Sequence, residues 1–128
     1  MQVYQGKLLA IDPSVIEEVT IEVNGLRIVA FSDNYGVEIN KTYQLELDFF
    51  LGDDDELNLV EISEPKYGLI RRGDSFSYEV YGKVIDDCID IGNEIKIQDE
   101  LFNEFSYLNN KFIKFNVIRL GVTFISAE

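Results

Sequence analysis

Strict alternation of apolar and polar residues constrains the fold of this chain more than any other feature of its sequence. The segments V-T-I-E-V (19–23), Y-Q-L-E-L-D-F (43–49) and I-K-F-N-V (113–117) all follow this pattern. Successive side chains of a strand point to opposite faces, so a period of two predicts strands that bury one face. The residues predicted to point into the core are Val19, Ile21, Val23, Ile28, Tyr43, Leu45, Leu47, Ile113, Phe115 and Val117.

The dipeptide Asn24-Gly25 lies between two such runs and predicts a tight β-hairpin. Both residues of the favoured two-residue turn need a positive φ, which asparagine and glycine adopt readily. The short loop fixes the register and places Glu22 opposite Arg27, which is a favourable pair of opposite charges. The outer face of this hairpin is then expected to carry Glu18, Thr20, Glu22, Arg27, Val29 and Phe31.

Turn residues divide the rest of the sequence into further expected strands. Residues 64–74 contain a proline and two glycines and are expected to be a short linker. This linker would join an acidic N-terminal half, residues 1–63, to a C-terminal half, residues 75–128. One or two helical turns are expected within residues 99–108, where three apolar residues are spaced by four and three. The expected strands lie near 2–11, 16–23, 26–32, 41–50, 57–63, 75–86, 88–91, 94–98, 111–118 and 121–126.

The two halves carry matched landmarks in the same order. In each half, a Gly-Lys pair precedes two apolar residues, and an Asn-Lys pair precedes an alternating strand. A degenerate internal duplication would explain this order, although alternating strands that follow turns resemble one another in any case. We therefore expect an all-β fold with two five-stranded, barrel-like halves that form one compact, pseudo-duplicated unit. The landmarks are Gly6-Lys7, Asn40-Lys41, Gly82-Lys83 and Asn110-Lys111.

The strand order of residues 3–62 resembles the OB-fold, a small Greek-key barrel that binds oligonucleotides, oligosaccharides and some proteins. The resemblance lies in G-K-L-L-A-I-D (6–12), V-T-I-E-V-N-G-L-R-I (19–28) and I-N-K-T-Y-Q-L-E-L (39–47), and a weaker likeness covers residues 80–126. An SH3-like barrel would share much of this pattern. The resemblance implies that the outer face of the hairpin binds a ligand.

The charge of the chain bears on its partners. It carries 24 acidic and 11 basic residues, for a net charge of −13. Residues 1–64 hold 14 of the acids and 3 of the bases, whereas residues 65–128 hold 10 and 8. Such an excess repels nucleic-acid phosphates and anionic membranes and attracts basic proteins. Solubility alone is the alternative explanation.

The sequence lacks residues that catalysis and metal binding commonly require. The sequence has no histidine, which is the commonest general base and metal ligand. Cys88 is the single cysteine, and the neighbouring aspartates are expected to raise its pKa and keep the thiol unreactive. The acidic run G-D-D-D-E-L-N (52–58) lacks the ligand spacing of a calcium loop. The sequence therefore predicts no catalytic residue, no cofactor and no metal site, and we expect the protein not to be an enzyme.

The compartment is expected to be the cytoplasm. The first residues lack the apolar stretch of a signal peptide, and no apolar run reaches the roughly 20 residues that a membrane helix needs. The Arg-Gly-Asp tripeptide at 72–74 is read by adhesion receptors outside cells, and a turn at Gly73 explains it here. No membrane partner is therefore expected.

These observations favour a non-enzymatic binding module for a basic protein partner, comparable to acidic nuclease inhibitors and to the immunity proteins of bacterial toxin systems. Its predicted surface is Glu18, Glu22, Val29, Phe31, Asp53, Asp54, Asp55 and Glu56. If another layer of the molecule covers Val29 and Phe31, they are ordinary core residues.

The alternative is an OB-type nucleic-acid binder that uses the less acidic C-terminal half. Such a binder needs basic residues and exposed aromatic rings in one groove. Nucleic acid is the less expected partner, because the net charge of that half is still negative. The residues considered for this role are Arg71, Arg72, Lys83, Lys96, Lys111, Phe112, Lys114 and Arg119.

Overall fold

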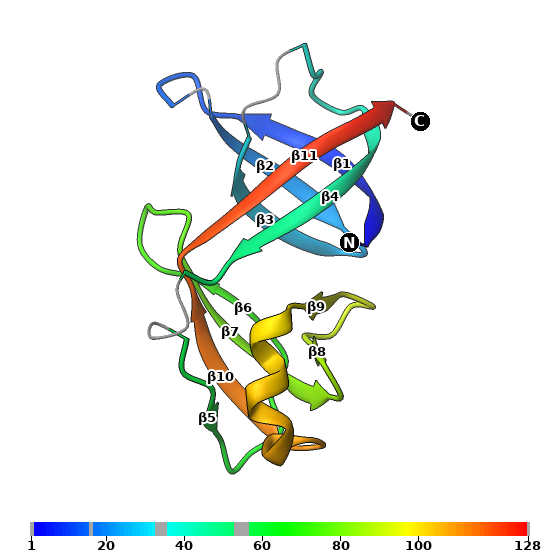
Figure 1. Ribbon diagram of the computed structural model, residues 1–128. Helices are drawn as coiled ribbons and strands as arrows, with labels where there is room; N and C mark the ends of the chain where they lie inside the picture. The colour runs from blue at the N-terminus through cyan, green and yellow to red at the C-terminus, as the bar shows by residue number, and fades with distance from the viewer. Residues whose placement is uncertain (1, 16, 33–35, 53–56, 128) are drawn as a thin grey trace. The chain divides into compact units, whose positions relative to one another are not determined.

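The computed structural model describes residues 2–15, 17–32, 36–52 and 57–127, and they are predominantly strands (Figure 1). All ten residues predicted to form the core are buried. The elements are β1 (Val3–Ile11), β2 (Glu18–Val23), β3 (Leu26–Phe31), β4 (Thr42–Phe50), β5 (Val60–Glu61), β6 (Gly68–Arg71), β7 (Tyr78–Ile85), β8 (Cys88–Asp90), β9 (Lys96–Gln98), the 3₁₀ helix η1 (Glu100–Leu108), β10 (Phe112–Val117) and β11 (Arg119–Ala127).

The chain forms two units, which we call the barrel unit and the open-sheet unit. The barrel unit contains Met1–Phe50 and Arg119–Glu128, and the open-sheet unit contains Leu51–Ile118. This division differs from the boundaries expected at residues 63 and 75. The reason is that β11, the last strand in the sequence, pairs with β4, with Arg119 opposite Phe50 at the start of the pairing. This strand therefore belongs to the barrel unit.

Five strands close the barrel in the order β1-β2-β3-β11-β4. The pairing of β3 with β11 is parallel, and the other pairings are antiparallel. This closed order is consistent with an OB-like barrel. The interior also contains residues that the sequence pattern had not singled out, namely Leu8, Leu120, Val122 and Phe124.

The β2–β3 hairpin has the register predicted from its turn. Glu22 faces Arg27 and Val23 faces Leu26, while Asn24 and Gly25 have φ values of 52° and 83°. The side chains of Val19, Ile21, Val23 and Ile28 therefore enter the core, as the alternation predicted.

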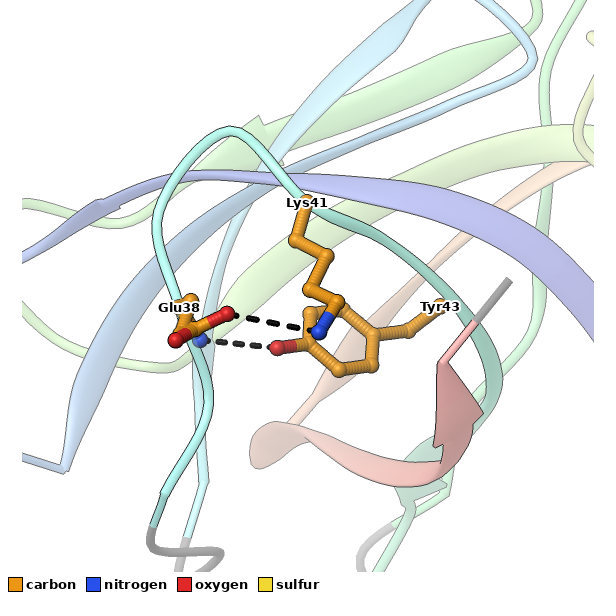
Figure 2. A network of polar contacts seen from close by, with 3 residues as sticks. All are labelled: Glu38, Lys41 and Tyr43. Carbon is orange, nitrogen blue, oxygen red and sulfur yellow. Dashed lines mark hydrogen bonds and ion pairs between the residues drawn. The ribbon is translucent and has the colours of Figure 1, made fainter.

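The turn that leads into β4 is held by polar contacts around Glu38 (Figure 2). The backbone N–H of Glu38 donates a hydrogen bond to the hydroxyl of Tyr43 at 2.7 Å, and Lys41 Nζ lies 3.3 Å from Glu38 Oε2. The ring of Tyr43 packs edge-on against Phe124, with 5.1 Å between centroids. The same residue thus fills the core and anchors the turn.

The open-sheet unit contains a six-stranded sheet in the order β5-β10-β7-β8-β9, with β6 added to β7. Its edge strands β5 and β9 do not pair with each other within the described part of the chain, so the expected second closed barrel is not found. Residues 64–74 were expected to be a linker, but β6 lies within them and pairs with Tyr78–Tyr81 of β7.

The expected helix within 99–108 is present as η1. Asp99 caps it, because its carboxylate accepts a hydrogen bond from the N–H of Leu101 at 3.0 Å. Phe102 and Leu108 are its buried residues, and Phe102 packs edge-on against Phe115 of β10 with 5.7 Å between ring centroids. A 3₁₀ helix has three residues per turn, so its buried face differs from the one that α-helical spacing predicts.

The Asn-Lys pairs of the two units make the same backbone contacts. Asn40 N–H donates to the carbonyl of Leu8, and Leu8 N–H donates to the carbonyl of Lys41. In the open-sheet unit, Asn110 bonds to Val84 and Val84 bonds to Lys111 in the same way. The two asparagines have φ values of 70° and 67°.

Candidate functional site

The outer face of the β2–β3 hairpin carries the four predicted site residues that the structure describes. Glu18 lies opposite Phe31, Val29 lies opposite Thr20, and Glu22 lies at the turn end of β2. Glu22 is exposed, and Glu18, Val29 and Phe31 are half-buried. Val29 and Phe31 are therefore not core residues of the barrel.

A row of residues crosses four strands at Phe31. Glu18 of β2 is the register partner of Phe31, Phe31 is paired with Gly121 of β11, and Gly121 faces Asp48 of β4. Residues directly opposite one another on neighbouring strands share a face of the sheet. The aromatic ring thus has a carboxylate residue beside it on one side and, beyond a glycine, another on the other side.

A hollow of about 100 Å³ lies beside Phe31, and we call it the Phe31 hollow. Gly121 contributes no side chain, so the space between Phe31 and Asp48 is left open. The side chain of Asp48 is exposed and has no hydrogen-bond or ion-pair partner among the described residues. The lining residues are Phe31, Asp48, Arg119, Gly121, Val122 and Thr123.

Arg119 places a cation over the aromatic ring of this site. Its guanidinium carbon lies 4.8 Å from the ring centroid of Phe31, which is the geometry of a cation–π contact. The sequence had suggested Arg119 as part of a basic C-terminal half, but the structure assigns it to the barrel unit. Arg119, Asp48 and Gly121 were missed as site residues because only the long-range pairing of β11 brings them to Phe31.

The predicted acidic surface does not coincide with one unit of the fold. Asp53, Asp54, Asp55 and Glu56 lie outside the described residues, and their positions fall in the range of the open-sheet unit. Nine acidic and four basic residues fall in the barrel unit, for a net charge of −5, and fifteen and seven in the open-sheet unit, for −8. The surplus expected in residues 1–64 is therefore divided between the two units.

A comparison with known families covers both units. The model of the family described as "Uncharacterised conserved protein UCP019853" matches residues 1–125. The chain belongs to this family. No curated protein and no solved structure matches it. Because the match runs through residues 51–118, the family model includes the open-sheet unit as well as the barrel strands.

Cys88, the single thiol of this family member, lies outside the Phe31 hollow. Burial, followed by the hydrogen bond and charge of Asp87, raises the pKa of the Cys88 thiol, which disfavours the nucleophilic thiolate. Within residues 2–15, 17–32, 36–52 and 57–127, no group of three or more acidic or cysteine side chains is placed to hold a metal ion. The same residues contain no helix long and apolar enough to cross a membrane.

The residues weighed for nucleic-acid binding are partly brought together. Lys83 of β7 faces Phe112 of β10, and Lys114 lies on the same outer face. Arg71 instead donates a hydrogen bond from Nε to the carbonyl of Ser75 and so holds the turn after β6. Arg119 belongs to the barrel unit, so the open-sheet unit holds one basic residue fewer than the set that the sequence suggested.

Proposed function

We propose that the protein is a non-enzymatic binding module whose Phe31 hollow and flanking carboxylates dock a basic protein. The observation that carries this proposal is the row Glu18–Phe31–Gly121–Asp48, in which a half-buried ring and an open space lie between two acidic residues. The carboxylate of Asp48, which has no partner among the described residues, suits a lysine or arginine of a partner protein, because a charge-assisted hydrogen bond is about twice as strong as a neutral one.

The docking follows from the charge and the shape of this surface. The chain's net charge of −13 attracts a basic protein over a distance and raises the association rate. In the docked complex, a cationic side chain pairs with Asp48 at the edge of the Phe31 hollow, away from the guanidinium of Arg119, and apolar atoms of the partner cover the part of Phe31 that Arg119 leaves exposed. Aromatic residues at the centre of an interface commonly contribute most to the dissociation rate.

Charge reversal on the row tests the role of the carboxylates. The variant Glu18→Lys/Asp48→Lys has a matched control in Asp74→Lys/Glu104→Lys, which reverses two exposed acids of the open-sheet unit. A basic protein captured by the wild-type chain from its native proteome should associate at least tenfold more slowly with the first variant than with the control. Capture of acidic proteins only, or equal rates for the two variants, would contradict the proposal.

Filling the hollow tests the role of shape. Gly121→Val adds a β-branched side chain, which strands accommodate well, and projects it between Phe31 and Asp48 without changing the net charge. The complex of this variant should dissociate faster while its association rate stays close to that of the wild type. An unchanged dissociation rate would show that the partner does not use the Phe31 hollow.

We also propose that the two units descend from one duplicated OB-like ancestor. The supporting observations are the matched Asn-Lys contacts and the common pairing order, since β7 pairs with β8 and β10 as β1 pairs with β2 and β4. Ancestral sequences reconstructed from the family should show rising identity between the two units toward the root. Identity that stays constant would contradict a duplication.

A further inference from the structure

The outer face of the open sheet carries aromatic and lysine side chains that the proposed function does not use. On β7 and β10, Lys83 faces Phe112 and Tyr81 faces Lys114, and these residues alternate with the buried Gly82 and Ile113. Lys66 and Tyr67, in the segment just before β6, belong to the same face, because Lys66 contacts the ring of Tyr81 and Tyr67 contacts the ring of Phe112. We call these six residues, Lys66, Tyr67, Tyr81, Lys83, Phe112 and Lys114, the aromatic–lysine face.

The rings of this face are in contact with cations and with each other. Lys66 Nζ lies 3.9 Å from the ring centroid of Tyr81, and Lys83 Nζ lies 5.9 Å from that of Phe112. Tyr67 meets Phe112 edge-on with 5.2 Å between centroids, and Tyr67 is 48% exposed. The rings of Tyr81 and Phe112 therefore lie beside ammonium groups, and the exposed ring of Tyr67 packs against Phe112.

The lysines of this face make no ion pair with any acidic residue that the structure describes. Of the described carboxylates, none lies within ion-pairing distance of Lys66, Lys83 or Lys114. The two acidic residues nearest in register are already engaged, because Glu79 accepts a hydrogen bond from the hydroxyl of Tyr81 and Asp90 accepts one from the N–H of Gly92. Three lysines therefore lie on one face without an ion pair to any described carboxylate, in a chain whose net charge is −13.

A hollow of about 200 Å³ continues the face beyond Lys114. The register pairing of β5 with β10 ends at Val60 opposite Lys114, and the hollow lies next to this end of the pairing. Amide side chains can donate and accept hydrogen bonds at once, as the edges of nucleobases require. The lining residues are Asn58, Val60, Glu79, Lys114, Phe115 and Asn116.

We propose that the aromatic–lysine face binds single-stranded nucleic acid. Bases stack on the rings of Tyr67 and Phe112, and also on Tyr81 once Lys66 has moved from above that ring to a phosphate. Lys83 and Lys114 contact further phosphates. A duplex keeps its bases stacked on one another, so rings that lie in the surface of a sheet select unpaired strands. The acidity of the rest of the chain weakens binding, and affinity is therefore highest at low ionic strength.

This proposal is independent of the docking function, because its residues all belong to the open-sheet unit. The probe is a fluorescently labelled oligonucleotide of mixed sequence, as single-stranded RNA or DNA and as a duplex. The full-length protein should raise the anisotropy of the single strands at low salt, and the duplex should bind at least tenfold more weakly. No binding of single strands at low salt, or equal binding of the duplex, would overturn the proposal.

Two variants connect the binding to the named residues. Lys66→Gln/Lys83→Gln/Lys114→Gln should reduce the slope of log affinity against log salt by about two, since each single-strand phosphate contact contributes roughly 0.7. The control Lys7→Gln/Lys41→Gln/Lys96→Gln has the same net charge and should keep the wild-type slope. Equal slopes for the two triple variants would show that general electrostatics, not this face, holds the strand.

The exposed ring of Tyr67 provides a test that does not depend on charge. Tyr67→Ser should weaken binding severalfold and leave the salt slope unchanged, because base stacking contributes about 1–3 kcal/mol per base and releases no counterion. Its fold is checked by circular dichroism. Wild-type affinity in this variant, or binding of anionic vesicles or acidic peptides in place of the oligonucleotides, would overturn the assignment.

Discussion

Replacing Gly6 by alanine should destabilise the barrel unit, mainly through a clash with the side chain of Leu45. Gly6 lies in β1 between its register partners Val23 and Tyr43. A Cβ at this position would lie 2.7 Å from Leu45 Cδ2 and 3.0 Å from Val23 Cγ2, well inside the usual carbon–carbon contact distance of about 3.5–4.0 Å. Leu45 is fully buried and its surroundings are packed, so it has little room to move.

The magnitude follows from two opposing effects. Overpacking a core of this kind costs about 1–3 kcal/mol. Alanine also lowers the conformational entropy of the unfolded chain, which raises the free energy of unfolding by about 0.4–1 kcal/mol where the native backbone conformation suits alanine. The φ of Gly6 is outside the left-handed region, so that gain is available and a net loss of about 1–2 kcal/mol is expected.

Gly121→Ala is the matched control in the same barrel. A Cβ at Gly121 would meet its nearest atoms at 3.5–3.9 Å, which is ordinary contact, so Gly121→Ala should be as stable as the wild type or more stable by about 0.4–1 kcal/mol. Urea unfolding would be combined with hydrogen exchange of the β4 amides, because two units need not unfold in one transition.

A double-mutant cycle identifies the clashing partner. Leu45→Ala alone should cost about 2–5 kcal/mol, because it leaves a cavity in the core. In Gly6→Ala/Leu45→Ala the added methyl group enters that cavity, so the losses should fall short of additivity by at least about 1 kcal/mol. Additive losses, or a Gly6→Ala variant as stable as Gly121→Ala, would refute the packing described for β1 and β4.

Three further predictions concern titration and helix capping. The N–H groups of Ser14 and Val15 lower the pKa of Asp12, and NMR titration should show this lowered pKa. The stability that the Asp12 carboxylate contributes is therefore present above its unfolded pKa and is lost as the pH falls through the folded pKa. Because the pKa of Cys88 is raised, maleimide should label it more slowly at neutral pH than a free thiol, and Asp87→Asn should speed the reaction. Asp99→Ala should cost about 1 kcal/mol in urea unfolding by removing the cap of η1.

Local patterns predicted the elements whose partners lie nearby in the chain. The Asn24-Gly25 turn fixes the register of β2 and β3 by itself, so the outward positions of Glu18 and Phe31 could be derived without a structure. The period of two similarly predicted the buried face of β4 and β10. In each case one short-range rule decides the outcome.

Long-range pairing could not be derived in the same way. The alternation in β11 shows that one face is buried, but it does not show that the strand pairs with β4 and β3 across the inserted residues 51–118. The pairing of β11 with β4 and β3 determines the boundaries of the two units. It also brings Asp48, Arg119 and Gly121 to the site. Pro65 and Gly68 likewise suggest a turn or linker, and neither indicates that the next residues add a strand to β7.

The insertion of the open-sheet unit between β4 and β11 has a consequence for biosynthesis. A ribosome makes the first four barrel strands early, but the strand that joins β3 to β4 emerges only after residues 51–118 have been translated. During that interval β3 and β4 have unpaired edges, which are the surfaces most prone to association with other chains. Once β11 emerges, the pairing of Arg119 with Phe50 returns the chain to the point where it left the barrel, and translation speed through the insertion therefore sets how long those edges stay exposed.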